Sequence, residues 1–206
     1  MQYGWGRGLA PARNEGAAAA AIDRALACLG KPLQRRRQTG ILAPAERDDA
    51  HTSSLSAIYG FQPFPMHSDT AHWATPARYL ALYCWRAGGT PSETKLLDIA
   101  SASLSSAERC LMEQAVFFVR NGRQSFYSSV VAPGRRYIRF DPGCMTPANP
   151  PAAAVVKMIA RLRDSSASMA LILQPGEILV LDNWRLLHAR GRVEDPSRRM
   201  IRGLAT

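Results

Sequence analysis

Short apolar runs that end near glycine or proline are the feature that most constrains how this chain can fold. The run at 78–85 is rich in aromatic and aliphatic residues and stops before Gly88 and Gly89, as a buried strand does. Two pairs of apolar runs flank the Pro-Gly turns at 132–134 and 174–176, which is typical of hairpins. The pattern predicts a mainly β fold, an antiparallel sandwich or barrel with a few flanking helices.

Helical periodicity is confined to three segments. Residues 17–29 and 152–163 each predict a helix. Ser105 and Glu108 form a capping-box pattern, and the apolar residues behind them recur at helical spacing up to Asn121. The third helix is therefore expected to begin after Ser105 and to end at Asn121.

A length of 206 residues suits one large domain. Residues 1–15 are rich in Gly, Arg and Pro, which predicts an irregular arm, and residues 33–53 are polar and predict a loop. We expect an N-terminal arm and helix at 1–54 and a β domain at 55–206, together forming one structural unit.

Composition and charge argue against several classes of partner. No stretch approaches the roughly 20 apolar residues that a membrane helix needs. The apolar run at 17–22 is interrupted by Asp23 and Arg24, unlike a signal peptide. The net charge is +10, but the basic residues are scattered and not interleaved with aromatic residues. We therefore expect a cytoplasmic protein with no membrane and no nucleic-acid partner.

One short motif points to metal chemistry. In an extended segment the side chains of His67 and Asp69 project from the same face. A third ligand is available in His188, at the end of the apolar run 178–188. Two histidines and one carboxylate on one face of an octahedron form the iron(II) site of non-haem oxygenases, which keeps positions open for substrates. The H-x-D motif alone is weak, and a structural role for each histidine remains an alternative.

The sequence around these residues adds a family resemblance. The segments at 59–89 and 174–203 resemble the taurine-dioxygenase-like family, which includes the carnitine-biosynthesis hydroxylases. The shared pattern is H-x-D, then a threonine before a strand, then a late histidine followed by arginine. The resemblance implies a double-stranded β-helix (jelly roll) core. It also implies iron(II) held by His67, Asp69 and His188, 2-oxoglutarate as cosubstrate, and O₂.

Further roles follow from the same resemblance. It assigns Thr94 and Arg199 to 2-oxoglutarate, whose distal carboxylate needs a buried partner; guanidinium offers two parallel hydrogen bonds and threonine one more. His72 and Trp73 are candidates for the substrate pocket, although packing around the iron is an equal alternative. The chain also ends four residues after Arg202, which leaves open a closing strand from a partner subunit and a homo-oligomer.

These features predict a dioxygenase that hydroxylates a C–H bond of a small molecule, such as an amino acid or a secondary metabolite, and forms succinate and CO₂. Two alternatives remain open. The same cofactors could drive desaturation, epimerisation or cyclisation, or the chain could be a catalytically silent binding module on the same fold. An intact set of ligands favours an enzyme.

Overall fold

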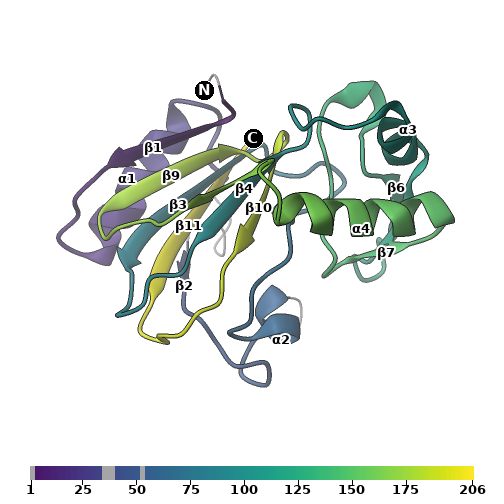
Figure 1. Ribbon diagram of the computed structural model, residues 1–206. Coiled ribbons are helices and arrows are strands. Elements are labelled where there is room, and N and C mark those ends of the chain that lie inside the picture. The colour runs from purple at the N-terminus through teal and green to yellow at the C-terminus, as the bar shows by residue number, and fades with distance from the viewer. Residues whose placement is uncertain (1–2, 34–39, 52–53) are drawn as a thin grey trace.

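The structure is a computed structural model that describes residues 3–33, 40–51 and 54–206 (Figure 1). Two antiparallel sheets form one half of the molecule. The major sheet has the strand order β1 (Trp5–Leu9), β9 (Glu177–Asp182), β3 (Tyr79–Arg86), β11 (Arg199–Ala205) and β2 (Gly40–Leu42). The minor sheet has the order β10 (Leu186–Arg190), β4 (Thr94–Asp98) and β8 (Ser168–Leu171). The mainly β fold expected from the sequence is confirmed.

The two sheets share an apolar core, which we call the intersheet core. It is built from alternate residues of the strands, since successive side chains point to opposite faces. The major sheet contributes Leu80, Leu179 and Met200, and the minor sheet contributes Leu96 and Leu186. The inner faces of β3, β4, β10 and β11 therefore enclose a common interior.

Helix α1 (Glu15–Ala27) covers the outer face of the major sheet. Its N-cap is Asn14, whose side chain accepts a hydrogen bond from the backbone of Ala17. Ile22 and Leu26 lie so close to β11 that a Cβ at Gly203 would be 2.3 Å from Ile22. Only glycine lets helix and strand approach this closely. Both faces of β11 are thus buried, one in the intersheet core and one beneath α1.

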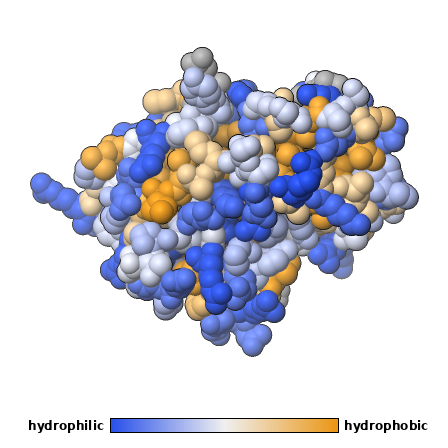
Figure 2. All heavy atoms as spheres, in the orientation of Figure 1, coloured by the Kyte–Doolittle hydropathy of each residue, from blue (hydrophilic) through white to orange (hydrophobic). Residues whose placement is uncertain are grey.

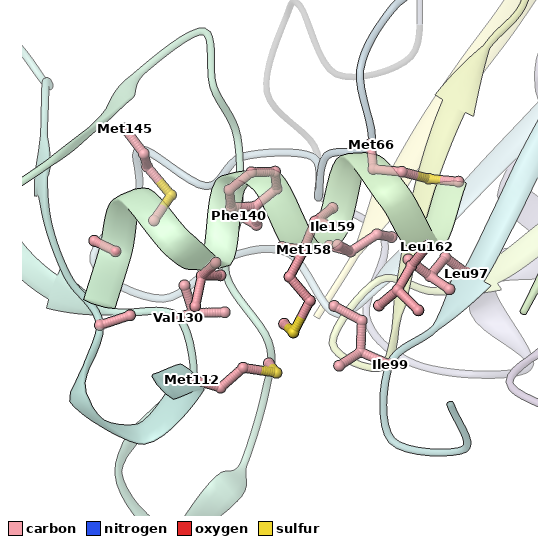
Figure 3. Close-up of a cluster of buried hydrophobic side chains, with 14 of the residues drawn as sticks. Met66, Leu97, Ile99, Met112, Val130, Phe140, Met145, Met158, Ile159 and Leu162 are labelled. Atoms are coloured by element: carbon pink, nitrogen blue, oxygen red, sulfur yellow. The ribbon is translucent and has the colours of Figure 1, made fainter. Parts of the chain in front are cut away.

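An inserted lobe, residues 105–165, forms the other half of the molecule (Figure 1). It contains α3 (Ser106–Gln114), β5 (Val116–Val119), β6 (Phe126–Ser129), the 3-10 turn η1 (Pro133–Arg135), β7 (Met145–Pro147) and α4 (Pro150–Arg163). Figure 3 shows its core, in which Met158 and Ile159 of α4 pack with Met112, Val130 and Phe140. Met66 and Leu97, which lie outside the lobe, are buried in the same cluster.

Several local expectations differ from the structure. The capping box at Ser105 is present, but α3 ends at Gln114, and 116–119 form a strand that pairs with β6 and β7. The hairpin expected across 174–176 does not form: β8 pairs with β4, and β9 pairs with β1 and β3. The hairpin expected across 132–134 forms but is short: Val131 and Ile138 bridge, and the N–H groups of Ala132 and Arg139 donate to the carbonyls of Tyr137 and Val130, while β6 pairs with β5.

The N-terminal residues belong to the sheets. The arm expected to be irregular contains β1, an edge strand of the major sheet. The loop predicted at 33–53 contains β2, which pairs with β11, and it also spans residues outside the described ones. The short helix α2 (Leu55–Tyr59) follows. The boundary predicted at residue 54 stays a prediction.

Among the described residues, no helix is long and apolar enough to cross a bilayer. On the face shown in Figure 2, hydrophilic residues are spread over both halves, and apolar residues form separate small patches.

Candidate metal centre

His67, Asp69 and His188 lie together at the inner face of the minor sheet, the face of β10 that His188 shares with Leu186. The backbones of His67 and His188 form an antiparallel bridge with two hydrogen bonds of 2.9 Å. Asp69 Oδ1 lies 3.6 Å from Nε2 of each histidine, and the three possible ligand atoms are within 4.8 Å of one another. All three residues are buried. The structure therefore brings together the ligand set expected from the sequence.

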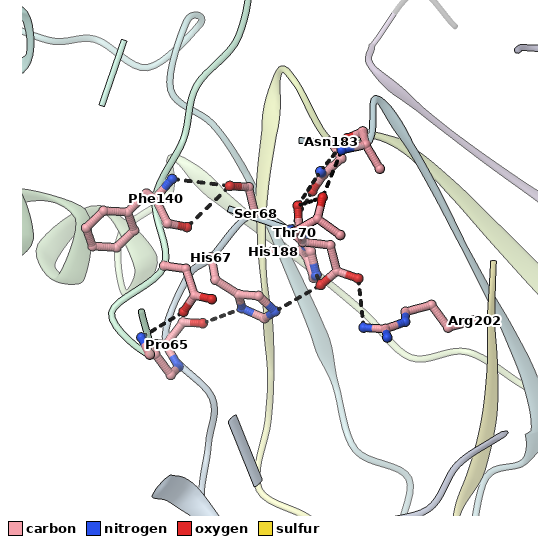
Figure 4. A network of polar contacts seen from close by, with 12 residues as sticks. Pro65, His67, Ser68, Thr70, Phe140, Asn183, His188 and Arg202 are labelled. Atoms are coloured by element: carbon pink, nitrogen blue, oxygen red, sulfur yellow. Dashed lines mark hydrogen bonds and ion pairs between the residues drawn. The ribbon is translucent and has the colours of Figure 1, made fainter. Parts of the chain in front are cut away.

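The segment that carries His67 and Asp69 is fixed from two sides (Figure 4). Ser68, between them, is fully buried; its backbone N–H donates to the Phe140 carbonyl at 2.7 Å, and its hydroxyl accepts from the Phe140 N–H at 3.2 Å. On the other side Asn183 accepts from the Asp69 N–H at 2.8 Å and donates to the Asp69 carbonyl at 3.0 Å. Asn183, in the turn between β9 and β10, therefore supports the backbone of Asp69.

The two histidines are anchored differently. Nδ1 of His67 lies 3.0 Å from the Pro65 carbonyl, so the proton is on Nδ1 in the neutral ring and the Nε2 lone pair faces Asp69. Metal-binding histidines are commonly oriented by such a bond to a backbone carbonyl. Nδ1 of His188 is buried and has no hydrogen-bond partner in the part of the chain that the structure describes.

Charge in the site is dominated by Asp69 and Arg202. Burial alone would raise the pKa of Asp69, but Arg202, His188 and His67 hold it well below its usual range. Arg202 Nη1 lies 3.1 Å from Asp69 Oδ2. Burial lowers the pKa of His67, yet hydrogen bonding to Asp69 and the charges of Asp141 and Asp69 raise it overall. Burial, together with the charge of His67, lowers the pKa of His188.

This donor set fits a divalent transition metal. Two imidazole nitrogens and one carboxylate oxygen converge in a buried site, as in the facial triad of non-haem iron(II) oxygenases. Because the low pKa keeps Asp69 ionised, the site offers the negative ligand that such a metal requires.

Thr94 faces the interior between the sheets. It is buried in β4, two residues from Leu96 and on the same face, and it pairs across the sheet with Arg190 of β10. On β10 the same alternation places Arg190 on the face that carries His188. Thr94 therefore borders the space next to the metal centre.

Arg199 does not face this space, which corrects the sequence-based expectation. Met200 and Leu204 point into the intersheet core, so Arg202 shares their face, whereas Arg199 shares the outer face with Ile201. The guanidinium of Arg199 donates to the carbonyls of Pro196 at 2.6 Å and Arg198 at 2.8 Å. Arg199 is thus engaged at the rim of β11, away from Asp69.

Arg198, the residue just before β11, is more buried than Arg199 or Arg202. It is 9% exposed, and burial lowers its pKa. Burial raises the pKa of the Cys84 thiol in the intersheet core, and the charge of Arg198 opposes this effect. Burial and the charge of Arg198 together lower the pKa of Arg190 to about 10. Among the described residues neither Arg198 nor Arg190 forms an ion pair with a carboxylate. The Arg190 guanidinium donates to the carbonyls of Gly60 at 2.6 Å and Gln62 at 2.9 Å, so Arg198 is the buried guanidinium that most lacks a compensating partner.

His72 and Trp73 follow the ligand segment. Their rings are 6.1 Å apart, and Trp73 packs against the intersheet core. Burial lowers the pKa of His72, and the charges of Asp141 and Asp69 oppose this effect, so His72 lies near the metal centre. Asp141, which also acts on His67, was not singled out by the sequence, where it is one aspartate in a run without a recognised motif.

Comparison with known proteins agrees with this site. Residues 105–204 match the family model described as taurine catabolism dioxygenase TauD, TfdA family. No curated protein matches the chain.

Several solved structures share the fold. An asparagine oxygenase in complex with Fe(II), a 3-hydroxyasparagine and succinate has 15% identity and a TM-score of 0.78, over 98% of this chain and 74% of that one. PvcB, an Fe, α-ketoglutarate-dependent oxygenase from an isonitrile synthetic pathway, has 17% identity and a TM-score of 0.71, and the match covers 99% of this chain and 76% of PvcB. The non-heme iron oxygenase OrfP, in complex with Fe, succinate and a dihydroxy-L-arginine, has 16% identity and a TM-score of 0.70, and the match covers 97% of this chain and 71% of OrfP.

Proposed function

We propose that this chain, whose residues 105–204 match the model of the TauD, TfdA family of dioxygenases, uses iron(II) and 2-oxoglutarate to hydroxylate a C–H bond of a small molecule. The observation that carries the proposal is the buried convergence of His67, Asp69 and His188. We also propose that the two packed sheets form the double-stranded β-helix of such enzymes.

In this proposal His67 Nε2, His188 Nε2 and one oxygen of Asp69 hold the iron. When bound, iron(II) with 2-oxoglutarate supplies the means to activate O₂ and oxidise a C–H bond, with succinate and CO₂ as products. Arg202 pairs with Asp69 Oδ2, and Oδ1 is the oxygen near both imidazoles. We infer that Arg202 restricts Asp69 to one metal bond, which keeps coordination positions open.

We further propose that Arg198 and Thr94, rather than Arg199, bind the distal carboxylate of 2-oxoglutarate. A buried guanidinium without an acidic partner is costly unless a ligand supplies one. Arg190, next to Arg198, lies two residues beyond His188, or about 7 Å along a strand. A five-carbon diacid can span that separation with one end at the metal.

The substrate class suggested by the neighbours is an amino acid. The asparagine oxygenase and OrfP are named with hydroxylated amino acids. In this chain the carboxylate of Asp141 and the guanidinium of Arg202 both act on the metal centre, and they would complement the ammonium and carboxylate of such a substrate. His72 and Trp73 are proposed to line the same pocket.

The test is incubation with iron(II), ascorbate and 2-oxoglutarate against a panel of amino acids, measuring succinate and product mass. Hydroxylation adds one oxygen atom to the product, whereas desaturation removes two hydrogens. Asp69→Ala is the control and should form no succinate. Iron binding with no succinate for any substrate, even uncoupled, would favour the binding-module alternative.

A further inference from the structure

Thr70, the residue after the proposed metal ligand Asp69, adopts an unusual backbone conformation. Its φ is 58°, and no other non-glycine residue in the described ranges has a positive φ. For a β-branched residue this left-handed region is a conformational outlier. Such strain persists only where the surrounding contacts fix the backbone, and it is often found at functional sites.

The hydrogen bonds of Asp69 and Thr70 hold only the backbone next to the proposed metal ligand Asp69. Asn183 brackets the peptide groups of Asp69, as described above. The Thr70 hydroxyl donates to the Asp69 carbonyl at 2.6 Å and accepts from the Ala77 N–H at 2.8 Å. These bonds fix Asp69 and Thr70 but leave the next residues to be held by other groups.

Arg139 of the inserted lobe holds those next residues. Its guanidinium donates to the carbonyls of Ala71, Trp73 (2.6 Å) and Ala74 (2.7 Å). It also donates to the Tyr137 hydroxyl at 3.1 Å and lies 5.0 Å from the centre of the Phe126 ring. Arg139 is 1% exposed, and these partners are all uncharged.

A buried cation is costly, and here carbonyl oxygens supply the compensation. Hydrogen bonds from a charged donor are about twice as strong as neutral ones. Three of them converge on a stretch of four residues that has no sheet partner of its own in the described chain. Arg139 therefore determines where the chain goes immediately after the turn at Thr70.

We propose that Arg139 is a positioning residue for the metal centre. By holding the carbonyls of 71–74, it keeps Thr70 in the left-handed conformation and so keeps Asp69 directed at His67 and His188. This inference rests on the proposed function, because it takes these three residues as the iron ligands. It also gives the inserted lobe a role in metal binding.

The experiment is a double-mutant cycle read out by metal affinity, not by turnover. Iron(II) dissociation constants are measured without oxygen for the wild type, Arg139→Gln, Thr70→Gly and the double variant. We expect Arg139→Gln to weaken iron binding by about 10- to 100-fold, the usual loss when a residue that orients metal ligands is replaced. Because glycine adopts positive φ at no steric cost, Thr70→Gly should restore much of that affinity in the double variant.

The controls separate positioning from general stability. Arg161→Gln removes an arginine that pairs with Glu108 on the lobe surface and should leave iron affinity unchanged. A folded Arg139→Gln with normal affinity, or a double variant that shows simply additive losses, would overturn the inference. If Arg139→Gln does not fold, Arg139→Lys takes its place, with the same rescue expected; failure of both to fold would show a purely structural role and also overturn it. Absence of iron binding in the wild type would instead refute the proposed function.

Discussion

Replacing Arg198 should weaken 2-oxoglutarate binding while sparing the stability of the ligand-free protein. The side chain is 9% exposed, lies beside Arg190, and has no carboxylate partner in the chain as described. Loss of a hydrogen bond to a charged group costs about 1.5–3 kcal/mol. That corresponds to roughly 10- to 150-fold in affinity, since about 1.4 kcal/mol is tenfold. Arg198→Met also removes an uncompensated buried charge, so the metal-free protein should unfold at the same or a higher temperature.

The assay is titration of 2-oxoglutarate into the iron(II) protein without oxygen, following the visible charge-transfer band that the family resemblance leads us to expect. Arg199→Met is the matched control, because its guanidinium bonds to the carbonyls of Pro196 and Arg198 on the outer face of β11. It should leave the dissociation constant unchanged. A large loss in Arg199→Met with none in Arg198→Met would show that the inner face of β11 has been assigned wrongly.

Two further predictions test the packing and the thiols. Gly203→Ala would place a Cβ 2.3 Å from Ile22 and 2.9 Å from Leu26, and overpacking of this kind costs about 1–3 kcal/mol of stability. The variant should therefore unfold at a lower temperature than the wild type. Gly8→Ala is the control: a Cβ there has no atom within 4 Å, so the unfolding temperature should not change. Burial and the charge of Asp141 raise the pKa of Cys144 to about 12, so iodoacetamide at about pH 8 should label the exposed Cys28 and Cys110 well before it. Early labelling of Cys144 in peptide maps would contradict its assigned environment.

The sequence could predict that the candidate metal ligands come together because their geometry is largely local. Residues i and i+2 of an extended segment share a face whatever surrounds them, so His67 and Asp69 project together. Only His188 had to be supplied by the fold; its place at the end of an apolar run suggested it, and the family resemblance supported it. The mainly β class followed from turn residues for the same reason, since glycine and proline act on the adjacent backbone.

The choice among the arginines of β11 could not be made in the same way. Alternation separates Arg199 from Arg198 and Arg202, but it does not say which face looks inward. Both faces of this strand are apolar, because one enters the intersheet core and the other lies beneath α1. Gly203 was the available signal: a glycine on the Arg199 face indicates close approach of another element, which is α1.

Strand partners were the second failure of local reasoning. Pro-Gly turns at 132–134 and 174–176 reverse the chain, but they do not determine which strand lies beside which. Across the second turn, β8 joins the minor sheet and β9 the major sheet. The helix predicted to reach Asn121 stops at Gln114 for a similar reason. The β-branched and aromatic residues at 116–119 gain two strand partners, which outweighs their helical periodicity.

The residues that shape the metal centre are distant in sequence, and this distance has a physical cause. The ligand segment after His67 is irregular, so its backbone groups need partners from elsewhere. They find Phe140 at a separation of 72 residues and Asn183 at 114. One partner comes from the inserted lobe and the other from the turn between β9 and β10. The candidate ligands therefore reach their positions only when both halves of the molecule have folded around them, which makes the geometry of the site sensitive to substitutions far from it.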